Sequence, residues 1–491
     1  MKNRRILLIV PPGGYYAERW SGGVLMPPLG IGYVAATLEQ SAHSVAILDA
    51  HVARMTDREI VRELMAFRPD IAGITFTTEN RFEAFRTARL IRETLPGCHV
   101  TGGGPHASLA AHDTLEGIEA FDSIVVGEGE TTMPLLADCL AAQGGDAGLR
   151  RIPGLVFRST DRSLVDTGPA LRIQNLDALP FPARHLYPAA ETYNFRFDVP
   201  GHGIKRFSNL MTSRGCPANC NFCATPKVWG RTVRMRSPEN IIAEMEAMVR
   251  EQGAEAFWFF DDTFNSNPRR VERLCDLMIE RGLDRMPWFC EVRVDVMSRE
   301  LLERMKTAGC YTIGFGVESG SQRILDDVIR KNLKLEKVHE LYGWCRELDV
   351  VANPFFIISH PTETWEEAQA TVSLIRTFKE RAHVSMAFLH VYPGTDLEET
   401  ARRNGTLPPD FRWYQDRNDV KTLASAQGNV PIFLDRLTWT QISDILFEWA
   451  KMQHFSVIRK IPKVLRSIRT WSDFFRYAVM GWRYIVNRIV R

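Results

Sequence analysis

The sequence predicts an α/β protein in which a doubly wound parallel sheet is followed by further βα repeats and then by a helical segment. Over residues 1–145, short apolar runs alternate with amphipathic segments of helix length. The alternation resumes over residues 206–405, whereas residues 406–491 show a helical stripe. Strands that alternate with helices favour parallel sheets with helices on their faces. At roughly 150 residues per domain, the 491 residues also indicate several domains.

The composition is that of a globular protein without a dominant charge. Hydrophobic residues make up 45%, charged residues 24%, and the net charge is +2. These values exclude a collagen-like or disordered chain and provide no global field for nucleic-acid binding. The amino-terminal apolar run is too short for a secretory signal, and no stretch approaches the length of a spanning helix. Nine cysteines are too dilute for a disulfide scaffold. We therefore expect a cytoplasmic protein that does not bind nucleic acid.

In the first region, strands and helices are expected to follow one another in turn. The expected strands are 6–10, 44–49, 71–75, 99–102 and 123–126, and the expected helices are 28–40, 57–67, 82–95 and 131–143. Such sheets bind ligands beyond the carboxyl ends of their strands. Glycine, proline and hydroxyl residues are frequent in the loops there: 11–14, 75–80, 102–106 and 127–130. These loops suit the close approach of a bulky ligand, although ordinary tight turns would also explain them.

Residues 146–205 are predicted to form a proline-rich linker, with room for a small hairpin around Asp161 and Arg162. The second set of repeats, over residues 206–405, then forms an open sheet or a partial (β/α)6 barrel. Its expected strands are 207–213, 256–260, 288–294, 311–317, 351–358 and 384–392, with helices that include 237–250, 268–280 and 364–376. Functional residues are expected at the carboxyl ends of these strands.

The carboxyl-terminal region, residues 406–491, is expected to be helical and basic. Apolar residues recur every three or four positions after Ile461, and residues 455–491 hold nine Lys or Arg against one acid, Asp473. A basic amphipathic segment of this kind either packs on the protein or contacts an anionic membrane surface.

The strongest motif is a set of three cysteines, Cys216, Cys220 and Cys223, directly after the first strand of the second region. Three thiolates at this spacing can bind three irons of a [4Fe–4S] cluster, and no fourth cysteine lies near, so one iron is left open. A zinc site would need a second cysteine pair. The later cysteines, Cys275, Cys290, Cys310 and Cys345, are scattered singly and are expected to be buried small hydrophobic residues.

These residues resemble the radical S-adenosylmethionine (SAM) superfamily, whose hallmark is Cys-x3-Cys-x2-Cys with an aromatic residue before the last cysteine. The resemblance implies that SAM chelates the open iron and is cleaved to a 5′-deoxyadenosyl radical, chemistry that no side chain supplies. By resemblance, the SAM-contact candidates are Phe222, Asp261, Asp262, Arg293, Glu318 and Ser319. A structural carboxylate remains the alternative for Glu318. Relatives usually carry glycines where Ser359 and Thr362 stand, so the backbone of this loop is expected to differ.

Because a region that resembles a radical SAM domain follows it in the chain, the first region resembles the Rossmann-like domain of the cobalamin-binding radical enzymes. The motifs that match are Gly102–His106 and Gly127–Glu130. The cobalamin-contact candidates are Pro12, Thr77, Gly103, Gly104, His106, Gly127 and Glu128. Many cobalamin proteins supply an axial histidine after the first strand, but loop 11–14 has none. His51 follows the second strand and lacks the accompanying glycine, so it is expected to be a surface or turn residue. The cobalamin is therefore expected to be held without histidine ligation.

The resemblance implies either of two kinds of chemistry. In one, methylcobalamin methylates the substrate and a second SAM remethylates the cobalamin, as in hopanoid methylases. In the other, substrate radicals undergo oxidation, cyclisation or rearrangement, as in the anaerobic bacteriochlorophyll cyclase. We expect methyl transfer to an unactivated carbon of a hydrophobic, lipid- or tetrapyrrole-like, or natural-product substrate, with an electron donor such as flavodoxin or ferredoxin. A transfer-RNA methylthiotransferase would need a second cysteine triad, which the region before Cys216 lacks.

Overall fold

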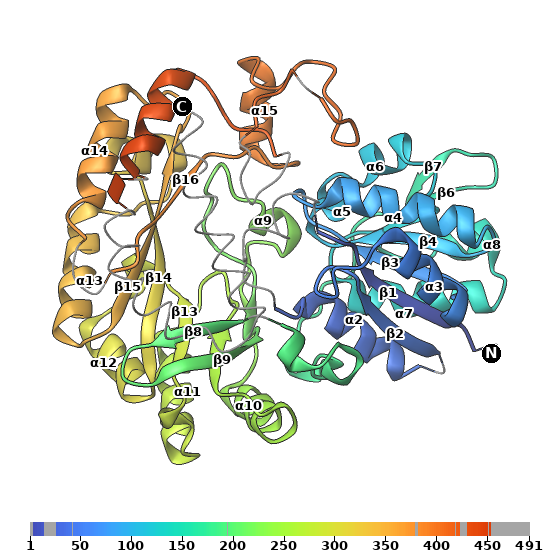
Figure 1. The fold of residues 1–491 in the computed structure, drawn as a ribbon, viewed down its shortest axis with the longest axis horizontal. Coiled ribbons are helices and arrows are strands. Elements are labelled where there is room, and N and C mark those ends of the chain that lie inside the picture. The colour runs from blue at the N-terminus through green and yellow to red at the C-terminus, as the bar shows by residue number, and fades with distance from the viewer. Residues whose placement is uncertain are drawn as a thin grey trace.

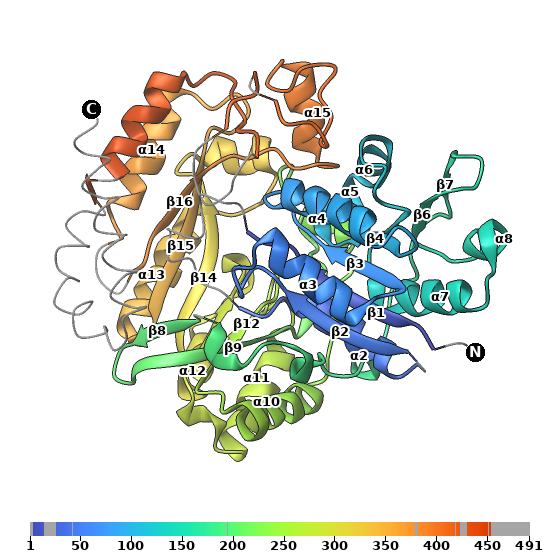
Figure 2. The same ribbon diagram turned by 45° about the vertical axis from the view of Figure 1, so that its right-hand side comes forward.

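The protein consists of two α/β lobes that lie side by side, each built on its own seven-stranded sheet (Figures 1 and 2). The amino-terminal lobe, blue to cyan in Figure 1, lies next to a larger lobe that runs from green to orange. The computed structural model describes residues 3–13, 26–41, 43–193, 195–378, 382–417, 419–422, 430–449 and 451–452.

The sheet of the first lobe has the order β2-β1-β3-β4-β5-β6-β7. Its parallel strands are β1 (Arg5–Val10), β2 (Ser44–Asp49), β3 (Ile71–Thr75), β4 (His99–Gly103) and β5 (Ser123–Val125). Each lies within about one residue of the range expected from the sequence. The chain order reverses between β1 and β3, the point at which doubly wound sheets bind ligands.

Alternation along β1 explains why helices cover both faces of this sheet. Ile6 and Leu8 pack on one side with residues of α2 and α7, whereas Leu7 and Ile9 pack on the other with residues of α3 and α4. The helices of this lobe are α2 (Leu29–Glu39), α3 (Asp57–Phe67), α4 (Arg81–Thr94), α5 (Pro105–Leu109), α6 (Ala111–Gly117), α7 (Gly129–Ala141) and α8 (Gly145–Leu149).

The segment 146–205, predicted as a linker, contributes strands to both sheets. Strands β6 (Leu155–Arg158) and β7 (Leu164–Asp166) form an antiparallel hairpin, with Asp161 and Arg162 at its turn, that extends the first sheet past β5. Strand β8 (Arg196–Val199) pairs antiparallel with the first strand of the second sheet. The first sheet therefore continues about 20 residues beyond the predicted boundary at residue 145.

The second sheet has the order β16-β15-β14-β13-β12-β9-β8 and is an open half-barrel. Its parallel strands are β9 (Gly203–Leu210), β12 (Ala256–Phe259), β13 (Trp288–Glu291), β14 (Cys310–Glu318), β15 (Val351–Ile358) and β16 (Ser385–Phe388). Helices α10 to α14 lie along the outer side of this sheet (Figure 1). The helices of this part are α10 (Pro238–Gln252), α11 (Pro268–Glu280), α12 (Arg299–Thr307), α13 (Leu335–Glu347), α14 (Trp365–Ile375) and α15 (Asp396–Arg403). Short 3-10 turns lie at Leu176–Ala178, Arg184–Leu186, Ala190–Thr192, Leu283–Arg285 and Val294–Val296, and a π-helical turn lies at Ile324–Ile329.

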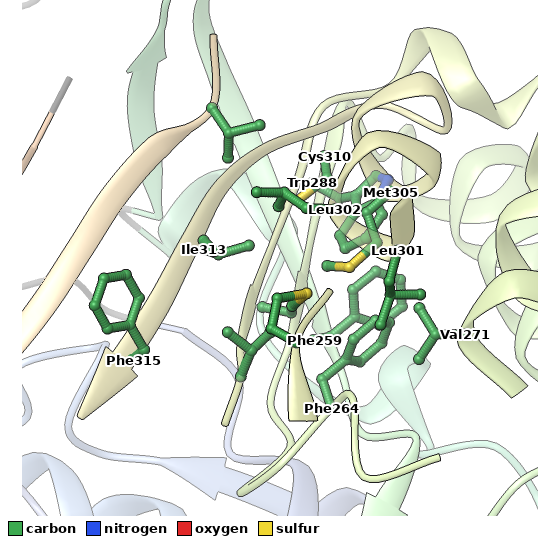
Figure 3. Close-up of a cluster of buried hydrophobic side chains, with 14 of the residues drawn as sticks. Phe259, Phe264, Val271, Trp288, Leu301, Leu302, Met305, Cys310, Ile313 and Phe315 are labelled. Carbon is green, nitrogen blue, oxygen red and sulfur yellow. The ribbon is translucent and has the colours of Figure 1, made fainter. Parts of the chain in front are cut away.

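The core between this sheet and its helices is apolar. Figure 3 shows Phe259, Trp288 and Phe315 from the strands with Leu301 and Met305 from α12. The four later cysteines, Cys275, Cys290, Cys310 and Cys345, are buried in the same core, which confirms their expected packing role. Among the described helices, none combines the length and apolar character needed to cross a bilayer. The chain is helical at 439–449 and 451–452. The predicted amphipathic basic segment, 455–491, lies outside the described residues.

Candidate functional site

A small antiparallel ribbon holds the three cysteines at the carboxyl end of β9. Strands β10 (Ser213–Arg214) and β11 (Arg234–Met235) pair with each other and enclose residues 215–233, which contain all three thiols and helix α9 (Thr225–Val228). Gly215 has φ +100°, and a Cβ there would lie 2.5 Å from the carbonyl oxygen of Thr232. Glycine is therefore required where the ribbon closes the segment.

The three thiols are partly buried and influence one another. Burial raises the pKa of Cys220 to about 11, with smaller effects of the other two thiols, and burial also raises the pKa of Cys223. Lys331 opposes the shift at Cys220, and both Cys216 and Cys220 act on the guanidinium of Arg293. In the absence of iron these thiols stay protonated, and a bound cluster would stabilise their thiolate form.

The donor set also fits the predicted cluster. Within the described ranges, no group of three His, Cys, Asp or Glu side chains is arranged to hold a single metal ion. In a [4Fe–4S] cluster, each cysteine binds a different iron, so convergence on one point is not expected. Three thiolates without a fourth leave one iron for an external ligand.

The predicted SAM-contact residues differ in how deeply their side chains are buried and in how many hydrogen bonds they already make. Asp261 is buried and accepts hydrogen bonds from the amide and hydroxyl of Thr212 and from Ser213, and Ser319 is fully buried against Thr371. Asp262 is exposed and accepts a hydrogen bond from Thr225 Oγ1 at 3.0 Å.

The other three candidates sit on the cysteine side of the sheet. Glu318 ends β14 with φ +70° and pairs with Lys331 Nζ at 2.5 Å. Arg293 pairs with Asp295 at 2.6 Å. The ring of Phe222 lies 6.1 Å from that of His360. A non-glycine residue in the left-handed region costs free energy, and a SAM contact from Glu318 stays a prediction.

Sequence reasoning missed one acidic residue, Glu291, which ends β13. Burial and, to a smaller extent, the carboxylates of Asp262 and Glu318 raise its pKa to about 7. The carboxylates of Asp262 and Glu318 therefore lie close enough to Glu291 to affect its ionisation. In the sequence, Glu291 could have been recognised as a candidate because it lies two residues before Arg293, a predicted SAM-contact residue.

The loop after β15 keeps a glycine-type backbone without glycine. Ser359 has φ +78° and Thr362 has φ +59°. The buried Glu363 carboxylate accepts the amides of Ser359 at 2.6 Å and His360 at 3.0 Å, and Ser359 Oγ donates to the carbonyl oxygen of Phe433. These bonds hold the strained turn, and a difference between this backbone and that of relatives with glycines at the two positions stays a prediction.

A cavity of about 290 Å³ lies at the carboxyl end of the first sheet, between β1, β3, β4 and β5. Of the predicted cobalamin residues, Thr77, Gly103, Gly104 and Gly127 line it. A Cβ added at Gly30, on its wall, would have no neighbour within 4 Å. Val228 and Trp229, which follow Cys223, complete the wall from the other lobe. An apolar hollow of this size, with a glycine-lined mouth at the switch point, fits one apolar part of a large ligand such as cobalamin.

Pro12, His106 and Glu128 do not line this cavity. His106 is fully buried, its Nδ1 lies 3.0 Å from Thr78 Oγ1, and burial lowers its pKa well below the usual value. Among the described residues on the cavity wall there is no histidine. His51 lies in the turn after β2 and is half-buried. Cobalamin contacts from Pro12, His106 and Glu128 stay predictions.

Glu128 instead joins the two lobes. It pairs with Arg214 at 3.3 Å and with Arg234, and its neighbour Glu130 pairs with Arg214 at 2.6 Å. Ile173, in the connecting segment, donates its amide to Glu128 at 3.1 Å. The Gly127–Glu130 loop is therefore fastened to the base of the cysteine ribbon.

A cysteine loop that leaves one iron open, placed against a cavity for a large second cofactor, defines a radical enzyme with two cofactor sites. Residues 210–375 match the radical SAM superfamily, and residues 21–137 match the B12 binding domain. An uncharacterized methyltransferase of Pyrococcus horikoshii is 32% identical over 407 residues, 83% of this chain and 85% of that protein. The chain belongs to the radical SAM superfamily, in the group that combines this domain with a B12 binding domain. Its cofactors are a [4Fe–4S] cluster, SAM and cobalamin.

Two further relatives differ in chemistry. The cytidylyl-2-hydroxyethylphosphonate methyltransferase of Streptomyces wedmorensis is 29% identical and the match covers 79% of this chain and 80% of that one. The anaerobic magnesium-protoporphyrin IX monomethyl ester cyclase of Cereibacter sphaeroides is 28% identical, with 70% and 55% covered. The solved structure of the cobalamin-dependent SAM radical enzyme OxsB aligns with a TM-score of 0.72 at 17% identity, over 99% of this chain and 72% of that one. The likeness to OxsB shows the fold.

Proposed function

We propose that this protein transfers a methyl group to an unactivated carbon of a hydrophobic small molecule. When bound, SAM and the cluster supply a 5′-deoxyadenosyl radical and cobalamin supplies the methyl group. The observation that carries the proposal is the position of Val228 and Trp229. They follow the last cysteine by five and six residues and also line the cavity of the first lobe. One substrate between the lobes could therefore face both cofactors.

The chain's own residues have separable tasks in this proposal. The cysteines hold the cluster, and Lys331 and Arg293 offset its negative charge. Glu318 and Asp262 are the carboxylates available to the amine and ribose groups of SAM. The apolar cavity holds the nonreactive part of cobalamin by burial. None of these groups selects the substrate's carbon, so we infer the hydrophobic class from the tetrapyrrole named for the cyclase relative and from the basic apolar tail.

The experiment is isotope tracing in cells with and without the gene, grown anaerobically on methionine with a deuterated methyl group. Mass spectrometry of lipid and tetrapyrrole extracts should find a species that carries the intact labelled methyl only when the gene is present. A control strain would carry the Cys216→Ala variant. Absence of any gene-dependent labelled species, with the protein present and loaded with both metals, would refute methyl transfer.

Oxidative cyclisation is the second candidate, and the match to the protoporphyrin ester cyclase favours it. The same extracts distinguish the two reactions. A cyclase product loses hydrogens relative to its precursor and gains no labelled methyl group, although 5′-deoxyadenosine is formed in both cases.

We further infer an electron donor of the flavodoxin or ferredoxin type, because cleavage of SAM needs one electron from the reduced cluster. We also infer peripheral contact with anionic lipid through residues 455–491, on the evidence of their nine basic residues and single acid. Flotation with anionic liposomes at low and high salt tests the lipid contact, since electrostatic binding weakens as salt screens it. No binding at low salt would exclude it.

A further inference from the structure

The two arginines that flank the cysteine segment both bind the first lobe. Arg214 precedes the segment and Arg234 follows it, and they are partners across the β10–β11 ribbon. Arg214 reaches both Glu128 and Glu130, and Arg234 reaches Glu128. We call these four residues the interlobe tetrad. Its carboxylates lie at the start of α7, Glu128 directly before the helix and Glu130 in its first turn.

The tetrad is buried and balanced in charge. The side chains of all four residues are at most 5% exposed, so solvent does not screen them. Although burial alone would lower the pKa of Arg214, Glu130 and then Glu128 raise it, so the guanidinium stays charged. Charge-assisted, forked contacts of this kind are directional, and they fix geometry more strongly than apolar packing does.

Two aromatic rings complete the contact and connect it with the cavity. The guanidinium carbon of Arg214 lies 5.2 Å from the ring of Tyr33 and 5.0 Å from the ring of Trp229. Both Trp229 and Glu130 line the cavity of the first lobe. The side chains that hold the ribbon therefore also form part of the cavity wall.

We propose that the interlobe tetrad consists of positioning residues that set the distance between cobalamin and the cluster. The proposal rests on the proposed function, because two cofactors must act on one substrate only in that reaction. Glu128 and Glu130 place the ribbon, the ribbon places the cysteines, and the cavity places cobalamin in the same frame. None of the four residues reacts with substrate in this scheme.

Glu244 provides a matched control for the effect of losing a buried charge. It is as buried as Glu128 and also pairs with two arginines, Arg184 at 2.8 Å and Arg236. Although burial alone would raise the pKa of Glu244, Arg236 and Arg184 lower it. Glu244 lies on α10, Arg184 in the connecting segment and Arg236 directly after β11, and among the described residues no ion pair joins these three to Glu128 or Glu130. A purely structural role of buried charge would affect the two sites alike.

The test measures the dipolar interaction between cob(II)alamin and the reduced cluster by paramagnetic resonance in the reconstituted protein. This interaction falls with the cube of the separation of the two spins. We expect one defined interaction in the wild type and a weaker or broadened one in Glu128→Gln and Arg214→Lys, with iron and cobalt contents unchanged. Glu244→Gln should keep the wild-type spectrum. A wild-type interaction in Glu128→Gln and Arg214→Lys would overturn the proposal.

If the variants fail to take up both metals, hydrogen exchange of the wild-type protein tests the same proposal. Hydrogen exchange of residues 213–235 should slow several-fold when hydroxocobalamin is added, because the cavity and the ribbon share the tetrad. Unchanged exchange in that segment, with cobalamin bound, would contradict the proposal. Failure to bind cobalamin at all would instead count against the proposed function.

Discussion

The two cofactor regions recognise their ligands by opposite means. The cavity of the first lobe is lined by apolar side chains and by glycines that include Gly30, Gly103 and Gly127. In the second lobe, a lysine and an arginine act on the thiols, and two carboxylates act on the buried Glu291 at the strand ends. A large rigid cofactor offers much surface, so shape and burial suffice to bind it. SAM and an iron–sulfur cluster are small and charged, and they need placed charges instead.

The largest expected effect comes from removing the thiols. Replacement of Cys216, Cys220 and Cys223 by Ala should abolish the cluster absorbance and all 5′-deoxyadenosine formation, while cobalamin still binds to the first lobe. Cys345→Ala, in the buried core, should retain both cofactors. Four irons per chain in the triple variant would show that other residues hold the cluster.

Gly104→Ala tests the shape-based site. Gly104 has φ +95° and ψ −177°, and a Cβ there would lie 2.8 Å from the carbonyl oxygen of Phe76. Since this region is almost restricted to glycine, we expect a loss of about 1–3 kcal/mol of stability and at least tenfold weaker cobalamin binding. Binding can be followed by the absorbance change of added hydroxocobalamin.

Gly97→Ala is the control for that change, because nothing lies within 4 Å of a Cβ at Gly97. It should bind cobalamin as the wild type does. Equal cobalamin affinity in the Gly104→Ala and Gly97→Ala variants would mean that the backbone at Gly104 does not shape the site.

The free energy of unfolding should fall as pH rises because of one buried carboxyl group in the second lobe, that of Glu363. Burial raises the pKa of Glu363 to about 7, above its value in the unfolded chain. The unfolded state therefore loses this proton first, and stability falls as pH rises between about 4.5 and 7. Glu363→Gln keeps an acceptor for the amides of Ser359 and His360 but removes the charge. It should be more stable than the wild type by about 2 kcal/mol at pH 8 and nearly equal at pH 5.

Thermal unfolding at the two pH values measures this difference. Thr371→Ser, which changes a buried neutral group nearby, should shift the melting temperature by the same amount at both. A Glu363→Gln variant whose advantage does not grow with pH would show that the carboxyl is not held neutral.

The last prediction is that two histidine substitutions leave the paramagnetic resonance spectrum of bound cobalamin unchanged. If cobalamin is held without a histidine, its cob(II)alamin resonance should show no nitrogen superhyperfine splitting from the protein, and His51→Ala and His106→Gln should leave the spectrum unchanged. A splitting that disappears in either variant would reverse this conclusion.

The sequence predicted the strands and most helices well because their signals are local. The apolar run of β1 and the glycine or proline residues after β1, β4 and β5 place the strands of the first sheet to within about one residue. In the second sheet, the expected ranges of β9, β13 and β16 differ from the observed ones by three or four residues at an end. The cysteine motif is also local, so the cluster site could be placed from spacing alone. Strand β8 and the pairing of the β6–β7 hairpin with β5 could not be predicted, because a single sequence contains no signal that shows which strands pair with each other.

The same reason explains which contacts at the site could not be predicted. Arg214, the partner of Glu128, lies 86 residues away in the sequence, and only the fold brings the two together. The contacts of His106 with Thr78 and Trp413 also come from distant parts of the chain. Glu291 likewise interacts with Asp262 and Glu318 only because the strand ends lie side by side.

The buried cysteines of the second lobe have a consequence for how the enzyme is assembled. The thiols of Cys275, Cys290, Cys310 and Cys345 are at most 1% exposed, so iron, alkylating reagents and peroxide reach them slowly, whereas the three cysteines of the ribbon are only partly buried. Once the lobe has folded, incoming iron and sulfide therefore meet few accessible thiols in the core. Folding of the half-barrel thus directs maturation of the metal centre to the ribbon, and it leaves the ribbon's thiols as the part of this lobe most vulnerable to oxygen.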